Sequence, residues 1–174
     1  MKVAVFLFGI ILLVACRSNQ QPPAMNEEEV KQHMMQANRI LVSREAEDIR
    51  EFITRHGWHM QQSGSGLHYE VYRKGSGPKA EPGSIVSVSY SLHLLDGTFC
   101  YEAALNKPLT FMLGKSEQPR GLEEGILQMQ VGSEARLIVP AHLGYGAIGD
   151  DNKIPGNSAL VYQVTLVKID HEKK

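Results

Sequence analysis

The sequence has few cysteines and little net charge. Its 174 residues include two cysteines, Cys16 and Cys100, and carry a formal net charge of -1. Cys100 stands alone in the part that we expect to fold, so no internal disulfide supports it and the hydrophobic core must suffice. Lysines and arginines are scattered, without a basic stripe interleaved with aromatic residues, which argues against nucleic acid as a partner.

Signatures of common catalytic sites are also missing. The sequence has no glycine-rich loop of the phosphate-binding type and no serine in a nucleophile elbow. The histidines are scattered, and His56 and His59 have no third ligand nearby, so we expect neither a metal nor a cofactor. Glu123 and Glu124 are adjacent and point to different sides of a helix, which argues against a pair of catalytic carboxylates.

A long apolar run occurs at the N-terminus, over residues 3–14, and it follows Lys2 and leads into Cys16. It is too short for a permanent membrane-spanning helix and is typical of a leader removed on export. The Leu13-Val14-Ala15-Cys16 motif resembles the lipobox of bacterial lipoproteins. The resemblance implies a signal peptide over residues 1–15, a lipid anchor on Cys16, and a place in the cell envelope facing the periplasm. The alternative is a secretory leader with an incidental cysteine.

A tether and a helix are predicted after Cys16. Residues 16–25 are polar and proline-containing, which indicates a flexible tether. Residues 26–57 are predicted to form a helical segment, because Asn26 and Glu29 have capping-box spacing and apolar residues recur at helical intervals until Gly57. Such a helix lies on the globular domain, pairs with a second copy in a homodimer, or stands as a stalk, and the sequence leaves these three arrangements open.

From Trp58 onward the hydrophobic pattern has a period of two, which predicts β-strands. Residues 58–82 are predicted to form short strands that lead into a domain over residues 83–170, and residues 171–174 to form a polar tail. We expect one short helix over residues 121–130 and strands over residues 86–94, 109–113, 137–139 and 160–166. The predicted fold class is α+β, with an antiparallel β-sheet wrapped on the short helix and preceded by the N-terminal helical segment.

Aromatic and aliphatic residues stand at the ends of the predicted elements and suggest an apolar pocket with a few hydroxyl groups, suited to binding rather than to proton transfer. Tyr145 lies between Gly144 and Gly146, where a large side chain on a flexible turn either lines a cavity or covers the core. The residues of the suggested pocket are Tyr90, Phe99, Leu122, Tyr145, Ile154 and Tyr162.

A series of motifs runs in order through residues 83–169: Leu95-Asp96-Gly97-Thr98-Phe99, Asn106-Lys107-Pro108, Arg120-Gly121-Leu122-Glu123-Glu124-Gly125, Gly144-Tyr145-Gly146 and Ile154-Pro155. Together they resemble an FKBP-type peptidyl-prolyl isomerase domain. With the lipobox, the N-terminal helical segment and the motif from Ser65 to Tyr69, the chain resembles more narrowly the exported FKBP-type lipoproteins, including the gliding-motility-associated isomerase lipoproteins.

The resemblance implies an FKBP-like fold and an isomerase that needs no cofactor and assists the folding of exported proteins. Its partners would be proline-containing unfolded or partly folded polypeptides, and the membrane through the lipidated cysteine. The resemblance places catalytic residues at Tyr90, Phe99, Tyr145 and Tyr162, and substrate-binding residues at Leu109, Leu122, Ile154, Cys100, Gln118 and Pro119.

The chain departs from the pattern of the family at several of these positions. Leu122 occupies the floor position, where the family often has Trp. Cys100 stands where the common motif has Asp, and Leu105 stands where an Arg often partners that Asp. Pro119 has no backbone N–H to donate where family ligands often accept one, and Phe99 lies one residue nearer the glycine than in the commonest pattern. These departures motivate an alternative function, a weakly catalytic or non-catalytic peptide-binding chaperone module.

Overall fold

The computed structural model describes residues 26–170 and begins with a long helix, α1 (Glu27–His56). The Asn26 side chain accepts a hydrogen bond from the Glu29 backbone N–H at 2.8 Å, and the Glu29 carboxylate accepts one from the Asn26 backbone N–H at 3.1 Å. This reciprocal capping box satisfies two of the free donors at the start of the helix. Gly57 ends the helix in the left-handed conformation, with φ of 62°. The predicted N-terminal helix is therefore confirmed.

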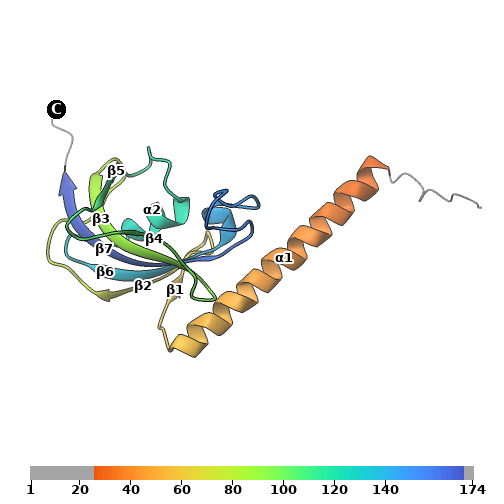
Figure 1. Cartoon of the computed structure of the whole chain (residues 1–174), viewed down its shortest axis with the longest axis horizontal. Helices are drawn as coiled ribbons and strands as arrows, with labels where there is room; N and C mark the ends of the chain where they lie inside the picture. The colour runs from red at the N-terminus through yellow and green to blue at the C-terminus, as the bar shows by residue number, and fades with distance from the viewer. Residues whose placement is uncertain (1–25, 171–174) are drawn as a thin grey trace, which may run out of the picture.

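The two halves of α1 have different surroundings (Figure 1). In the C-terminal half, Ile49 and Phe52 are buried in a small cluster with Ile138 and Val161 of the sheet. The N-terminal half extends away from the domain (Figure 1). Several large apolar side chains between the start of α1 and its middle are exposed: Val30, Met34, Met35, Ile40, Leu41 and Val42. Within residues 26–170 no helix is both long and apolar enough to cross a membrane.

The rest of the domain is an antiparallel sheet of seven strands, which confirms the predicted fold class. Its order is β1-β2-β6-β7-β3-β4, and β5 pairs with β3 beside this path. Tyr90 on β3 and Tyr162 on β7 belong to the long pairing of these strands, where Tyr90 lies opposite Val164 and Tyr162 opposite Leu92. The strand bounds are β1 (Gln61–Gln62), β2 (His68–Arg73), β3 (Ile85–Leu94), β4 (Phe99–Ala103), β5 (Leu109–Met112), β6 (Glu134–Val139) and β7 (Leu160–Asp170).

The short helix α2 (Arg120–Ile126) lies close against β6. A Cβ atom on Gly121 would lie 2.4 Å from Val139 Cγ1, and one on Gly125 would lie 2.4 Å from Leu137 Cδ1. The two glycines thus permit a helix-to-sheet distance that larger residues would prevent. This approach buries Leu122 completely in the main core.

Some boundaries differ from the sequence predictions. The helix predicted over residues 121–130 ends at Ile126, because the backbone beyond it is engaged elsewhere: Met129 O accepts a hydrogen bond from Ala80 N–H at 3.0 Å. Strand β4, from Phe99 to Ala103, was not predicted. The predicted leader, tether, lipid-anchor cysteine and C-terminal tail lie outside the described residues.

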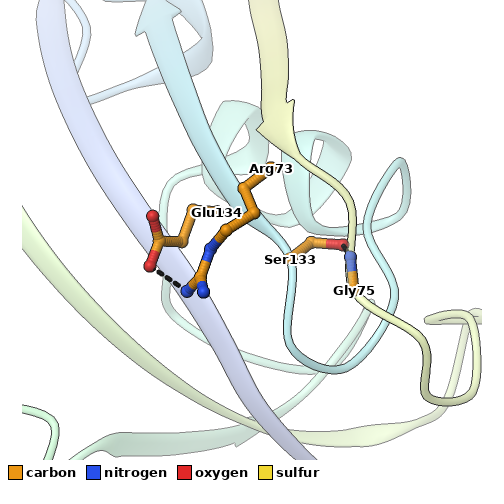
Figure 2. A network of polar contacts seen from close by, with 4 residues as sticks. All are labelled: Arg73, Gly75, Ser133 and Glu134. Carbon is orange, nitrogen blue, oxygen red and sulfur yellow. Dashed lines mark hydrogen bonds and ion pairs between the residues drawn. The ribbon is translucent and has the colours of Figure 1, made fainter.

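A closely packed junction connects the chain after β2 with the start of β6 (Figure 2). Gly75 N–H donates a hydrogen bond to Ser133 Oγ at 3.0 Å, and Arg73 forms an ion pair with Glu134 beside it. Ser133 is 1% exposed. A Cβ atom on Gly75 would lie 2.1 Å from Val131 O, a backbone atom that cannot move aside easily. The junction therefore requires glycine at this position.

Gly75→Ala should lower the free energy of unfolding by about 2 kcal/mol or more, because the added methyl group must push two backbone segments apart. Urea unfolding followed by the fluorescence of Trp58 measures this change. Gly64→Ala is the matched control, since nothing lies within 4 Å of its added Cβ. Equal stability of the two variants would contradict the packing argument.

Candidate functional site

Three tyrosines from separate elements lie near one another at the main core. The Tyr90 and Tyr162 rings lie with their centroids 5.6 Å apart at an angle of 59°. Tyr145 follows a short 3-10 helix, η1 (Ala141–Leu143), that continues from β6. All three tyrosines belong to or pack on the main core, which also contains fully buried Leu122. We call Tyr90, Tyr145 and Tyr162 the tyrosine cluster.

The hydroxyl groups of the tyrosine cluster are held in a poorly solvated environment. Burial raises the pKa of Tyr90 and is the first cause of the raised pKa of Tyr145. Burial, with smaller effects from Tyr145 and Tyr90, raises the pKa of Tyr162 well above its ordinary value. Since that value is about 10, all three side chains are neutral at physiological pH and can donate a hydrogen bond.

The loop that carries Tyr145 is held at both ends. Gly146 N–H donates to Ala141 O at 2.8 Å, and Ala141 N–H donates to Glu45 Oε1 of α1 at 2.6 Å. Ile154, another predicted site residue, is 3% exposed and lies in the same core as the tyrosine cluster. Tyr90, Tyr145, Tyr162, Leu122 and Ile154 thus all belong to or pack on the same main core, and their grouping into one site stays a prediction.

Phe99 and Cys100 are placed differently from the other predicted site residues. Phe99 is 47% exposed, and its ring meets that of His93 edge to face, with centroids 5.4 Å apart. It does not belong to the core that contains the tyrosine cluster. Cys100 is fully buried in that core, and burial is the first cause of the raised pKa of its thiol. The thiol is therefore a protonated packing group rather than a polar group offered to a ligand.

The remaining predicted residues lie at the margins of the site. Leu109 is half-buried and packs on the core. Pro119 is buried, and its carbonyl oxygen accepts hydrogen bonds from Leu122 N–H at 2.9 Å and Glu123 N–H at 3.2 Å, so it begins α2. Gln118 is half-buried, and its backbone N–H donates to Ser116 Oγ at 3.1 Å. Its backbone donor is therefore already engaged by a neighbouring side chain.

Two polar residues near the tyrosine cluster were missed by the sequence analysis. Tyr101 donates a hydrogen bond from its hydroxyl to Asp150, and both residues lie close enough to Tyr145 to influence its pKa. A signal was available, because Phe99 lies one residue nearer Gly97 than in the commonest family pattern. If the family motif is aligned on Gly97 instead of on Phe99, Cys100 stands at the position where the motif has Phe. Tyr101 then stands at the position where the motif has Asp.

The described residues form a groove outside the tyrosine cluster but no cluster of metal ligands. Within residues 26–170 no group of three or more His, Cys, Asp and Glu side chains could hold a metal ion. A groove of about 610 Å³ lies between α1, the loop after β3 and the loop that follows Tyr145, and no residue of the tyrosine cluster lines it. Leu41, Val42 and Ala159 contribute apolar surface to this groove.

Comparison with known proteins identifies the family. A family model described as FKBP-type peptidyl-prolyl cis-trans isomerase matches residues 77–167. This chain belongs to that family. We refer to residues 77–167 as the isomerase domain.

Named relatives match mainly through this domain. FK506-binding protein 4 of Dictyostelium discoideum is 41% identical over 103 residues, which make up 59% of this chain and 28% of the relative. Peptidyl-prolyl cis-trans isomerase FKBP2 of Mus musculus is 36% identical over 97 residues, covering 55% of this chain and 69% of the relative. The chain therefore spans less than a third of the length of the first relative.

Solved structures share the fold. AtFKBP13 is 28% identical with a TM-score of 0.59, and the match covers 64% of this chain and 99% of that one. FkpA from Escherichia coli is 25% identical with a TM-score of 0.63, and the match covers 85% of this chain and 75% of that one. The second match is longer than the isomerase domain, so the similarity to FkpA includes residues outside it.

Proposed function

We propose that the protein is a peptidyl-prolyl cis-trans isomerase that acts on proline-containing segments of unfolded or partly folded exported polypeptides. The observation that carries the proposal is the tyrosine cluster on the core that contains fully buried Leu122, in a chain of the FKBP-type family. The proline ring would pack against the partly exposed Tyr90 and Tyr145, with buried Leu122 in the core behind them, and a hydroxyl of the cluster would hold the peptide carbonyl. Neither a nucleophile nor a cofactor is required for this chemistry.

The reaction needs a particular environment rather than a reactive group. Rotation about the X-Pro bond is slow because it breaks amide resonance, with a barrier of about 18–20 kcal/mol. The twisted transition state has less charge separation than the planar amide. A poorly solvated apolar site therefore stabilises it relative to the ground state, and a neutral tyrosine hydroxyl orients the carbonyl.

Tyr145→Ala should lower kcat/KM for a proline-containing peptide at least about tenfold, which corresponds to about 1.4 kcal/mol of lost transition-state stabilisation. The reason is that the substitution removes both a hydroxyl and a wall of the tyrosine cluster. A protease-coupled isomerisation assay measures the rate. Tyr72→Ala is the control, because Tyr72 is 43% exposed and stacks on Arg136 on a different part of the sheet. Equal activity of wild type and Tyr145→Ala would contradict the assigned site.

The second candidate function is a peptide-binding chaperone module with little catalysis. The groove beside α1 and the exposed apolar residues of its N-terminal half favour this function. The two candidates are separated by assaying one preparation for isomerisation and for suppression of the aggregation of an unfolded protein. Suppression without any acceleration of isomerisation would favour the chaperone module.

We also propose that the chain is anchored to the bacterial cell envelope through lipidated Cys16 and faces the periplasm. The proposal is supported by the apolar leader and the Leu13-Val14-Ala15-Cys16 motif. Each buried methylene of an acyl chain contributes about 0.8 kcal/mol, so several chains on one residue would hold the protein firmly. The tether over residues 16–25 would then separate the anchor from α1.

Cys16→Ser should move the protein from the membrane fraction to the soluble fraction and remove the added lipid mass. Cell fractionation and mass spectrometry of the intact protein measure these two effects. Cys100→Ala is the matched control, because the buried Cys100 thiol is unavailable to a lipid-transferring enzyme. Loss of membrane binding in both variants, or in neither, would argue against an anchor at Cys16.

We further propose that α1 pairs with a second copy in a homodimer. At 100° per residue, Val30, Met34 and Leu41 fall within about 40° of one another on the helix, so they form one apolar stripe. These three side chains are exposed, although Leu41 also lines the groove beside the Tyr145 loop. The N-terminal half of α1, with Val30 and Met34, extends away from its own domain (Figure 1). A second copy of the same stripe is the simplest apolar surface to cover it.

Met34→Glu should convert the protein from a dimer to a monomer, because it places a charge in the centre of the proposed seam. Sedimentation equilibrium measures the mass. Gln36→Glu is the control, since it adds the same charge to the opposite face of the helix. Wild-type protein that sediments as one chain at micromolar concentration would refute the dimer.

A further inference from the structure

A β-bulge in β4 turns Cys100 and Tyr101 toward the interior of the isomerase domain. Leu92 of β3 pairs with Tyr101, whereas the next residue, His93, pairs with Phe99, so Cys100 is the extra residue on β4. Directly paired residues share one face of a sheet. Tyr101 therefore lies on the same face as buried Leu92, and Phe99 lies on the opposite face with His93.

The inward-facing Tyr101 reaches the loop that follows Tyr145. Its hydroxyl donates a hydrogen bond to Asp150 Oδ2 and accepts one from Asn152 Nδ2 at 3.1 Å. The other carboxylate oxygen of Asp150 accepts hydrogen bonds from Ile154 N–H at 2.7 Å and Asn152 N–H at 3.0 Å. We call the contact between Tyr101 and Asp150 the hydroxyl–carboxylate latch.

The negative charge of the Asp150 carboxylate strengthens the hydrogen bond of this latch. Burial opposes ionisation of Asp150, but the hydrogen bonds from the Tyr101 hydroxyl and from backbone N–H groups outweigh it and lower the pKa of Asp150. The carboxylate is therefore ionised at neutral pH, and hydrogen bonds to an ionised acceptor are the stronger kind. Lys153 adds a second link, because its Nζ donates to Cys100 O at 2.8 Å and lies 5.1 Å from the centre of the Tyr101 ring.

The loop held by the latch is closed by its own backbone. Gly149 N–H donates to Tyr145 O at 3.2 Å, and Asp150 N–H donates to Ile154 O at 3.1 Å. Gly149 has φ of 87°, and a Cβ atom on it would lie 2.1 Å from Ile154 O, so the two sides of the loop are in close contact. Because these hydrogen bonds join Tyr145 to the residue next to Asp150, we expect that fixing Asp150 also fixes Tyr145.

We propose that the hydroxyl–carboxylate latch holds the Tyr145 loop against β4 so that the Tyr145 hydroxyl meets the substrate carbonyl, which makes Tyr101 a positioning residue for isomerisation. The inference rests on the proposed isomerase function. The family often has a polar Asp–Arg pair at the positions of Cys100 and Leu105, which this chain lacks. In our inference, the contact between Tyr101 and Asp150 takes the place of that pair. Small errors in the placement of a group that contacts the transition state cost rate strongly, so the latch would act through geometry.

Tyr101→Phe removes the hydroxyl and keeps the ring, and it should lower kcat/KM for a proline-containing peptide about three- to tenfold. The measurement uses the full chain purified in detergent. Tyr69→Phe is the matched control, because it removes an exposed hydroxyl that donates to Gln61 at 2.9 Å outside the tyrosine cluster. We expect the control to keep wild-type activity.

A double-mutant cycle with Tyr145→Phe separates positioning from general destabilisation. If the latch acts through the Tyr145 hydroxyl, Tyr101→Phe will cost little further activity once that hydroxyl is gone. Asp150→Asn weakens the same latch from the other side and replaces Tyr101→Phe if that variant does not fold. Unchanged kcat/KM in the latch variants, or losses that simply multiply with that of Tyr145→Phe, would overturn the inference. An inactive wild-type protein would overturn the proposed function instead.

Discussion

The close approach of α2 to β6 is the constraint on which the rest of the isomerase domain depends. Gly121 and Gly125 face Val139 and Leu137 at distances that leave no room for a Cβ atom without displacing those side chains. Because the helix lies so near the sheet, Leu122 is completely buried at the centre of the core. The tyrosine cluster is then defined by the strands and the loop that surround this one residue. A Cβ atom at Gly121 or Gly125 would therefore push α2 away from β6 and shift Leu122 with it.

A second constraint acts on the opposite side of the tyrosine cluster, where the β-bulge at Cys100 sets which side chains face inward. Without the extra residue, Phe99 and Tyr101 would share one face of β4, since side chains alternate along a strand. With it, Cys100 fills the core, Tyr101 faces the Tyr145 loop, and Phe99 is left on the outer face with His93. Counted from Gly97, Cys100 and Tyr101 stand at the sequence positions where the family pattern has an aromatic residue and an acid.

Much of the fold could be predicted from the sequence, because its signals are local. The capping box and Gly57 gave both ends of α1, and strict alternation gave β3. The tyrosine cluster also followed from the order of motifs. The placement of Phe99 and Cys100 could not be predicted in the same way, because a bulge is decided by how β4 pairs with β3 and leaves no local periodicity. The early end of α2 had a similar cause, since Met129 bonds to a distant segment.

The Tyr145 loop shows why the site is harder to predict than the fold. Its position is set by contacts from two distant parts of the chain, Glu45 of α1 at Ala141 and Tyr101 of β4 at Asp150. Neither contact can be recognised by spacing, because each joins residues almost 50 or more positions apart. The same arrangement links α1 mechanically to the tyrosine cluster, since the C-terminal half of α1 packs on the sheet and supplies Glu45. A shift of α1, including one caused by pairing of its exposed half, would therefore reach the loop through this hydrogen bond and through the packing of Ile49 and Phe52 on Ile138.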